Sequence, residues 1–185
     1  VRSRRQRQMC IRDRDNSGSA KPLNNGKGTT FEGGMRVMTI FKGPNIQTGI
    51  VEDIGSQLDF FTTILTLAEI ESPFNPEDSY DLSQTLRYKK SSPRQTIPYF
   101  VGSELRAFRY KNHKIHFVTQ GAYNLPPKRV EHEIPLLFNL EADIGEEEAL
   151  SNLSLIEEVN RQADLFKDGL KIRNSILDIQ YIDLQ

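Results

Sequence analysis

The sequence predicts an α/β protein that ends in a small antiparallel sheet, and three observations favour this fold class. An apolar run at residues 36–41 is followed by a helical pattern at 56–69, which is typical of a strand and helix in an α/β domain. Residues 72–94, rich in proline and lysine, then interrupt the pattern as a linker. Beyond them, four strand-like stretches separated by turn residues predict a meander, followed by an amphipathic helix. We therefore expect residues 15–95 to end a larger α/β domain and residues 96–185 to form a small α+β subdomain.

The strand and helix of the first part are predicted from local signals. Residues 36–41 contain β-branched side chains and end at a Gly-Pro pair, which predicts a buried strand and a turn. Ser56 and Asp59 have the spacing of a helix capping box. The apolar residues that follow recur at helical spacing and predict a stripe that faces a core. These residues are Leu58, Phe61, Ile64, Leu65 and Ala68.

The small subdomain is predicted to be a four-stranded antiparallel sheet with a helix packed on it. The four strands are expected at residues 97–101, 104–110, 113–119 and 134–140. Gly102-Ser103 suits a two-residue type II′ hairpin between the first two. Ser154 and Glu157 predict a capping box, and the helix after them has one apolar stripe. Residues 176–184 alternate weakly and are expected to form an edge strand.

Composition and charge exclude several classes of protein. The 185 residues are 37% hydrophobic and 26% charged, which suits a domain with its own core. No apolar run is long enough for a membrane span, so we expect none. Six arginines lie in residues 1–14, so the rest of the chain is more acidic than the net charge of -1 suggests. Because an acidic surface repels phosphate, we expect no nucleic-acid partner.

The basic arm, residues 1–14, shares no pattern with the sequence after it. Its arginines could bind nucleic acid, or the arm could be a disordered tail. It also resembles the translation of a sequencing-adapter remnant. We therefore expect the arm to be disordered and foreign to the protein. The single cysteine, Cys10, lies within it.

Residues 15–36 form a polar stretch with five glycines, and such a stretch is either an idle loop or a place of close backbone approach. Asp15 and Asn16 are adjacent oxygen donors of the kind that calcium or magnesium accepts. Lys27 lies between Gly26 and Gly28, so its ammonium could reach a bound anion. On composition alone, an Asx turn in an idle loop is the more common meaning of such residues.

Three segments carry a resemblance to the formylglycine-dependent sulfatases. Asp15-Asn16, a Lys-Pro-Leu triplet and the run GKGTTFEGGMRV at 26–37 together resemble the family's second signature, although Ser17 separates Asn16 from the glycine that usually follows it. The run KIHFVTQG at 114–121 resembles a segment of arylsulfatase A-like members. The run PLLFNLEADIGE at 135–146 resembles a third family segment, with isoleucine in place of the usual proline.

This resemblance implies an alkaline phosphatase-like fold and calcium-dependent hydrolysis of a sulfate ester. By resemblance, Asp15 and Asn16 would be calcium ligands, and Lys27 would be catalytic, contacting the sulfate and its bridging oxygen. His116 would contact the substrate at the pocket rim, although a surface or sheet-packing histidine is the slightly favoured alternative. The formylglycine nucleophile belongs to the family's N-terminal half. Cys10 lacks the Cys-x-Pro-x-Arg context for conversion to it.

The resemblance also implies a setting for the protein. The substrate would be a sulfated small molecule or a sulfated carbohydrate. The parent protein would be periplasmic, secreted or lysosomal, and the present chain by itself is expected to be inactive. Two other functions stay open at this point: a phosphodiesterase or phosphonate hydrolase of the same superfamily, and a non-enzymatic binding module.

Overall fold

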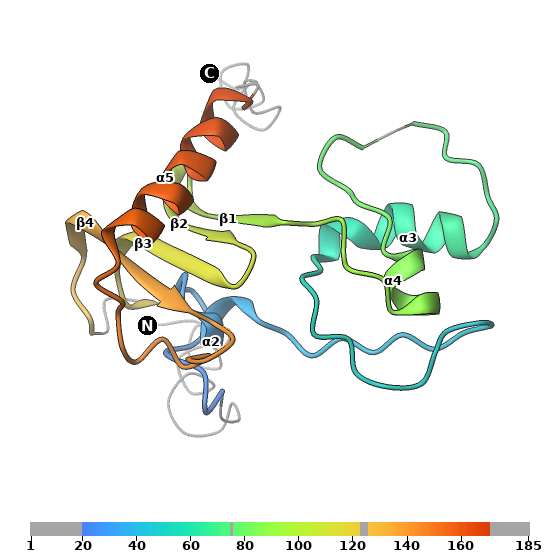
Figure 1. Cartoon of the computed structure of the whole chain (residues 1–185), viewed down its shortest axis with the longest axis horizontal. Helices are drawn as coiled ribbons and strands as arrows, with labels where there is room; N and C mark the ends of the chain where they lie inside the picture. Colours follow the sequence, from blue (N-terminus) through green and yellow to red (C-terminus); the bar gives the residue numbers. More distant parts are fainter. Residues whose placement is uncertain (1–19, 75, 123–125, 171–185) are drawn as a thin grey trace, which may run out of the picture.

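The computed structural model describes residues 20–74, 76–122 and 126–170, which form two lobes (Figure 1). One lobe holds the sheet and the long C-terminal helix, and the other holds two short helices. The elements in chain order are α2 (Glu32–Met35), η1 (Gln57–Asp59), α3 (Phe60–Leu67), α4 (Ser83–Tyr88), β1 (Thr96–Val101), β2 (Glu104–Tyr110), β3 (His113–Thr119), β4 (Val130–Asn139) and α5 (Leu153–Asp168).

The predicted meander is confirmed. The four strands pair antiparallel in the order β1-β2-β3-β4. Gly102 has a φ of +61° while Ser103 does not have a positive φ, as expected for the predicted type II′ turn. The last strand begins earlier than predicted, at Val130, because β4 continues past an irregularity opposite the His116–Val118 step of β3.

The predicted packing of the C-terminal helix on the sheet is also confirmed. Residues of β2, β3, β4 and α5 share one apolar core, made of Phe108, Ile115, Leu137, Ile156, Val159 and Ala163. The predicted capping box at Ser154 is wrong. Asn152 is the N-cap of α5, and its side-chain oxygen accepts a hydrogen bond from the Leu155 N–H at 3.1 Å. Asn152 stands three residues before Leu155, which is the spacing that an N-cap requires.

The second face of the sheet is covered by the glycine-rich segment, which includes the short helix α2. Thr30, Phe31 and Glu32 are buried, and the Phe31 ring stacks on the His116 ring of β3 with centroids 4.8 Å apart. In Figure 1 this segment and α2 lie beside the sheet and not beside α3 and α4. The boundary near residue 95 stays a prediction, but residues 20–36 make their contacts with the sheet.

The predicted buried strand at residues 36–41 is wrong in this structure. The segment is extended but pairs with no strand in the described part of the chain. The side chains of Val37, Met38 and Ile40 are 77%, 90% and 83% exposed. A strand needs a neighbour to satisfy its backbone groups, and none is present among the described residues.

The apolar stripe predicted to be core along the first helix is instead mostly exposed. The capping box of Ser56 and Asp59 is confirmed, with both of its hydrogen bonds formed. However, Leu58, Phe61 and Ile64 are exposed, and the buried side of this helix carries Asp59 and Thr63. The Phe61 ring stacks on the Phe74 ring with centroids 5.0 Å apart, but most of this apolar face is exposed.

The predicted linker at residues 72–94 contains a helix, α4, that its composition did not reveal. The end of the predicted linker is also anchored. The Arg94 guanidinium is buried and binds both carboxylate oxygens of Asp59, at 2.6 and 2.7 Å. The prolines that suggested a linker all lie outside α4. The arm at 1–14, Asp15, Asn16 and residues 176–184 lie outside the described residues.

Candidate functional site

Gly33 and Gly34 make close contacts within the loop of residues 24–34. The Gly33 N–H donates to the Asn24 carbonyl at 2.9 Å, so the loop folds back over the start of α2. A Cβ on Gly33 would lie 2.4 Å from the Asn24 oxygen, and one on Gly34 would lie 2.4 Å from the Thr29 oxygen. Both distances are too short for any side chain. The Gly33-Gly34 pair is therefore required by the packing of this loop on itself.

Lys27 lies at the exposed turn of this folded loop. The Thr29 amide and hydroxyl both donate to the Gly26 carbonyl, at 3.2 and 2.8 Å, and close the turn around Lys27. Gly28 has a φ of +90°, which glycine adopts at no steric cost. No acidic side chain of the described residues forms an ion pair with Lys27. Its ammonium is therefore available to an anionic ligand.

A buried charge network fastens this loop to the sheet. The Lys114 ammonium of β3 is fully buried and lies 2.9 Å from Glu32 and 3.0 Å from Glu146. The second oxygen of Glu146 accepts the Glu32 backbone N–H at 2.6 Å, and Arg36 binds Glu32 at 2.9 Å. The face of the Tyr99 ring lies 4.5 Å from the Lys114 ammonium. Each buried charge thus has an opposite charge and a hydrogen bond, as burial requires.

The pKa values in the network favour the charged carboxylates. Burial by itself would raise the pKa of Glu32, but the charge and hydrogen bond of Lys114, with those of Arg36, hold this pKa below its usual value. Burial likewise opposes ionisation of Glu146, and its hydrogen bond to His116 with the charge of Lys114 lowers its pKa. With both carboxylates ionised, Lys114 and Arg36 balance their charge.

His116 belongs to the same network and is fully buried. Burial lowers its pKa, and this outweighs the opposite effect of its hydrogen bond to Glu146. The ring is therefore neutral at pH 7, and its Nε2–H donates to the Glu146 carboxylate at 2.7 Å. The Thr30 hydroxyl lies 3.4 Å from Nδ1. His116 thus lies under the loop rather than at an open rim, and its contact with a substrate stays a prediction.

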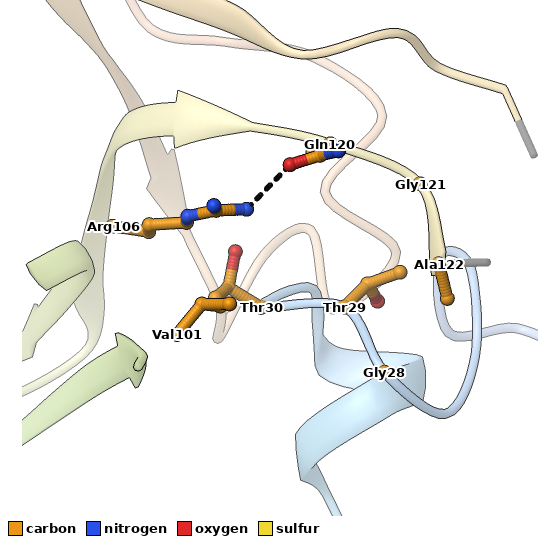
Figure 2. Close-up of a pocket in the computed structure, with 8 residues that line it drawn as sticks. All are labelled: Gly28, Thr29, Thr30, Val101, Arg106, Gln120, Gly121 and Ala122. Carbon is orange, nitrogen blue, oxygen red and sulfur yellow. Dashed lines mark hydrogen bonds between the residues drawn. The ribbon is translucent and has the colours of Figure 1, made fainter. Parts of the chain in front are cut away.

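A small pocket of about 320 Å³ opens on the other side of the same loop. Figure 2 shows the Arg106 and Gln120 side chains meeting above Thr29 and Thr30. Arg106 Nη1 donates to the Gln120 side-chain oxygen at 2.7 Å, and Arg106 Nε donates to Glu104 at 2.7 Å. Gly28, which lines the pocket, directly follows Lys27. The loop that exposes Lys27 therefore also forms a wall of this pocket.

Sequence reasoning missed most of this site although its residues stood in the quoted segments. Glu32, Lys114 and Glu146 each lie in one of the three runs that carry the family resemblance. The signal that could have found them is their chemistry, because a lysine within an otherwise apolar strand needs an acidic partner. Arg106 lies outside these runs, and nothing in its sequence context marked it.

The described residues do not form a metal site of their own. Among residues 20–74, 76–122 and 126–170, no group of three or more His, Cys, Asp or Glu side chains could hold a metal ion. The expected calcium ligands Asp15 and Asn16 fall outside these ranges. No helix in the described part of the chain is long and apolar enough to cross a membrane.

Comparisons with known proteins agree with the resemblance. Residues 92–181 match the family model described as the C-terminal region of aryl-sulfatase. The chain is 35% identical to arylsulfatase A of Bos taurus over 157 residues, covering 76% of this chain and 30% of that protein. It is 36% identical to N-acetylgalactosamine-6-sulfatase of Sus scrofa over 156 residues, covering 72% of this chain and 30% of that protein.

A solved structure gives the same result for the fold. The crystal structure of PsFucS1 sulfatase from Pseudoalteromonas sp. matches with a TM-score of 0.70 at 23% identity, covering 84% of this chain and 34% of that one. The α/β class and the small antiparallel sheet are therefore those of a sulfatase. The chain spans about a third or less of the length of each of these relatives.

Proposed function

Because this chain corresponds to the C-terminal portion of a sulfatase, we propose that its protein hydrolyses a sulfate ester and that Lys27 binds the sulfate. One observation carries the proposal. Lys27 is an exposed lysine of a loop that closes on itself at Gly33 and Gly34 and is fastened by a buried charge network. A fixed loop that presents a lysine with no acidic partner among the described residues suits recognition of a small anion.

Lys27 has two tasks in this proposal. Its ammonium attracts the sulfate oxygens in the bound substrate, and it stabilises the negative charge that develops on the bridging oxygen as the alcohol leaves. A loop that is already ordered loses little conformational freedom when it binds, so the ammonium need not be repositioned during the reaction. The buried network serves this function by fixing the loop backbone and not by touching the substrate.

Calcium fits the donors that the sequence offers at Asp15 and Asn16. A carboxylate and a side-chain amide oxygen are hard ligands, which calcium prefers. Since calcium usually takes six to eight oxygens, further ligands must join these two. Calcium bound there would draw charge from the sulfuryl group. The nucleophile is expected to be a formylglycine from the part of sulfatases that this chain does not match.

The proposal is tested in the full-length protein with Lys27→Ala, assayed on 4-nitrophenyl sulfate. We expect turnover to fall about a hundredfold, the usual scale for losing one charge-stabilising group. Lys90→Ala is the matched control, since Lys90 is also an exposed lysine in a loop, and it should retain turnover within about twofold.

Two results would argue against the proposal. Full turnover by Lys27→Ala would show that Lys27 is not part of the site. Faster hydrolysis of bis(4-nitrophenyl) phosphate than of the sulfate would instead favour the phosphodiesterase alternative. Asp15→Ala should in addition weaken calcium affinity measured by calorimetry, and equal affinity in the parent and the variant would remove Asp15 from the calcium site.

A further inference from the structure

We propose that Arg106 and Gln120 form a subsite for the alcohol part of the substrate and select a sulfated sugar ring over a simple aryl sulfate. This inference rests on the proposed function, because it places the leaving alcohol next to the sulfate bound by Lys27. Gly28 and Thr29 line the pocket, and they are the two residues that follow Lys27 in the sequence. A sulfate held by Lys27 would therefore direct its alcohol toward this pocket.

The backbone turns Arg106 toward the pocket by a β-bulge. Tyr99 of β1 lies opposite Ala107, whereas the next residue, Phe100, lies opposite Leu105. Arg106 is thus the extra residue of β2 and has no partner in the ladder. Bulges of this kind re-aim a side chain and are over-represented beside active sites.

The hydrogen bonds of the pair hold it in place but leave donors available. Glu104 binds Arg106 Nε, and the Gln120 oxygen binds Nη1. Among the described residues, none accepts a hydrogen bond from Arg106 Nη2 or from the Gln120 amide nitrogen. Both residues line the pocket, and the Arg106 side chain is only 15% exposed, so these donors border a confined space. A ligand that fills this space needs oxygen acceptors.

The rest of the lining favours a sugar over an aromatic ring. Val101 and Ala122 are the apolar side chains of the pocket, and no aromatic ring lines it among the described residues. A volume of about 320 Å³ lies near the lower limit of ligand pockets, which run from about 300 to 1,000 Å³. The pocket therefore suits one oxygen-rich ring and not an extended chain.

The charge around the pair suits a neutral or weakly acidic sugar. Glu104 lies between two arginines, since it also binds Arg129 at 2.8 Å. The negative charge of Glu104 is therefore shared by two arginines and neutralises Arg106 only in part. The remaining positive charge of Arg106 can attract a ligand. A charged donor in a confined site discriminates strongly against a ligand that lacks the matching acceptor.

The test uses the full-length protein with Arg106→Met and Gln120→Leu, assayed on a panel of hexose monosulfates and on phenyl sulfate. On the best hexose sulfate, we expect kcat/KM to fall at least tenfold for Arg106→Met and about threefold or more for Gln120→Leu, the range for losing charged and neutral hydrogen bonds. On phenyl sulfate, whose ring offers these donors no oxygen acceptor, both variants should lose less, so that the preference for the sugar sulfate falls.

Arg129→Met is the matched control. It removes the other arginine bound to Glu104 without removing a pocket donor, and it should leave both activities within twofold. The melting temperature of each variant shows whether it folds. If Arg106→Met does not fold, Gln120→Leu, which changes an uncharged residue after the end of β3, carries the test.

Each other outcome has a distinct meaning. Equal loss on both substrates by folded variants would make the pair structural and overturn the subsite. No loss on either substrate would overturn it as well. A parent protein that cleaves phenyl sulfate but no hexose sulfate would overturn the choice of a sugar. A parent that cleaves no sulfate ester at all would overturn the proposed function, on which the subsite depends.

Discussion

At the residue scale, Lys114 is the side chain on which the site depends most. It is a fully buried ammonium that touches two buried carboxylates from segments 82 and 32 residues away in sequence. Such an ion pair adds little net stability compared with apolar residues of the same size, but breaking it leaves uncompensated charge. What it provides is a fixed position for the loop that carries Lys27.

Lys114→Met should therefore destabilise the chain strongly. Two ionised carboxylates would lose their shared cation, and the expected loss is about 3–5 kcal/mol in the free energy of unfolding, measured by urea titration. Lys167→Met provides the comparison, because Lys167 forms an exposed pair with Asp164, and it should cost about 1 kcal/mol or less. Similar losses for both variants would contradict the central place of Lys114.

His116 should make the stability depend on pH in a defined direction. Its pKa in the folded chain is lower than the ordinary value of 6.5, so the unfolded chain binds this proton first as the pH falls. The stabilisation is therefore complete above pH 6.5 and declines below it, by at most about 1.4 kcal/mol per pH unit. Glu32 and Glu146, with lowered pKa values, add a second decline below pH 4.5.

His116→Gln tests whether His116 causes the loss of stability below pH 6.5. Glutamine keeps a neutral donor for Glu146 but does not titrate, so the slope of unfolding free energy between pH 6.5 and 5 should become flatter than in the parent. His113, whose pKa partial burial also lowers, accounts for the slope that remains. An unchanged slope would mean that His116 is already protonated in the folded chain.

At the element scale, the glycine-rich loop is a compact unit whose shape depends on Gly33 and Gly34. Gly34 has the Thr29 and Gly26 carbonyl oxygens within 2.4 and 2.6 Å of where a Cβ would stand, whereas Gly26 has no atom within 4 Å. These two positions in one loop therefore differ in what they can tolerate, although both match the family pattern.

Gly34→Ala and Gly26→Ala form a matched pair of variants. Gly34→Ala must move the loop backbone and should lower the free energy of unfolding by about 1–3 kcal/mol, the usual cost of overpacking. Gly26→Ala should stay within about 0.5 kcal/mol of the parent. Chemical denaturation measures the free energy of unfolding of both variants. Equal values would mean that the loop is not closed as described.

Elements with local signals could be predicted from the sequence, and those that depend on distant partners could not. The hairpin turn at Gly102 and the apolar stripe of α5 depend on residues that are close in sequence. The sheet and its helix could therefore be predicted. The strand at residues 36–41 and the stripe along α3 have equally strong patterns, but a pattern does not show whether a partner is present. The network joining Glu32 to Glu146 was missed because hydrophobic periodicity carries no information on which charges meet.

At the scale of the whole molecule, the two lobes differ in how complete they are. The sheet lobe has α5 on one face and the glycine-rich loop on the other. The lobe of α3 and α4 leaves large apolar side chains exposed, among them Met38, Ile40 and Ile64. Exposed apolar surface of this extent marks an interaction site or a site of aggregation.

We therefore expect the purified chain to associate with itself through this lobe. Replacing Met38 and Ile40 together by lysine should raise the monomer fraction in sedimentation velocity at a given concentration. Replacing Leu165, an apolar residue of α5 that is 56% exposed, by lysine should have little effect. A parent chain that stays monomeric at high concentration would contradict the expectation.

The buried network also has a consequence for the order in which the chain can mature during synthesis. Asn24 and Glu32 leave the ribosome long before Glu146, which follows them by 122 and 114 residues and binds both. Until Glu146 is available, Lys114 and His116 lack one of their partners, and the loop cannot be fastened at its far side. The lysine that we place at the sulfate is thus made early but positioned late, after the last strand of the sheet has emerged.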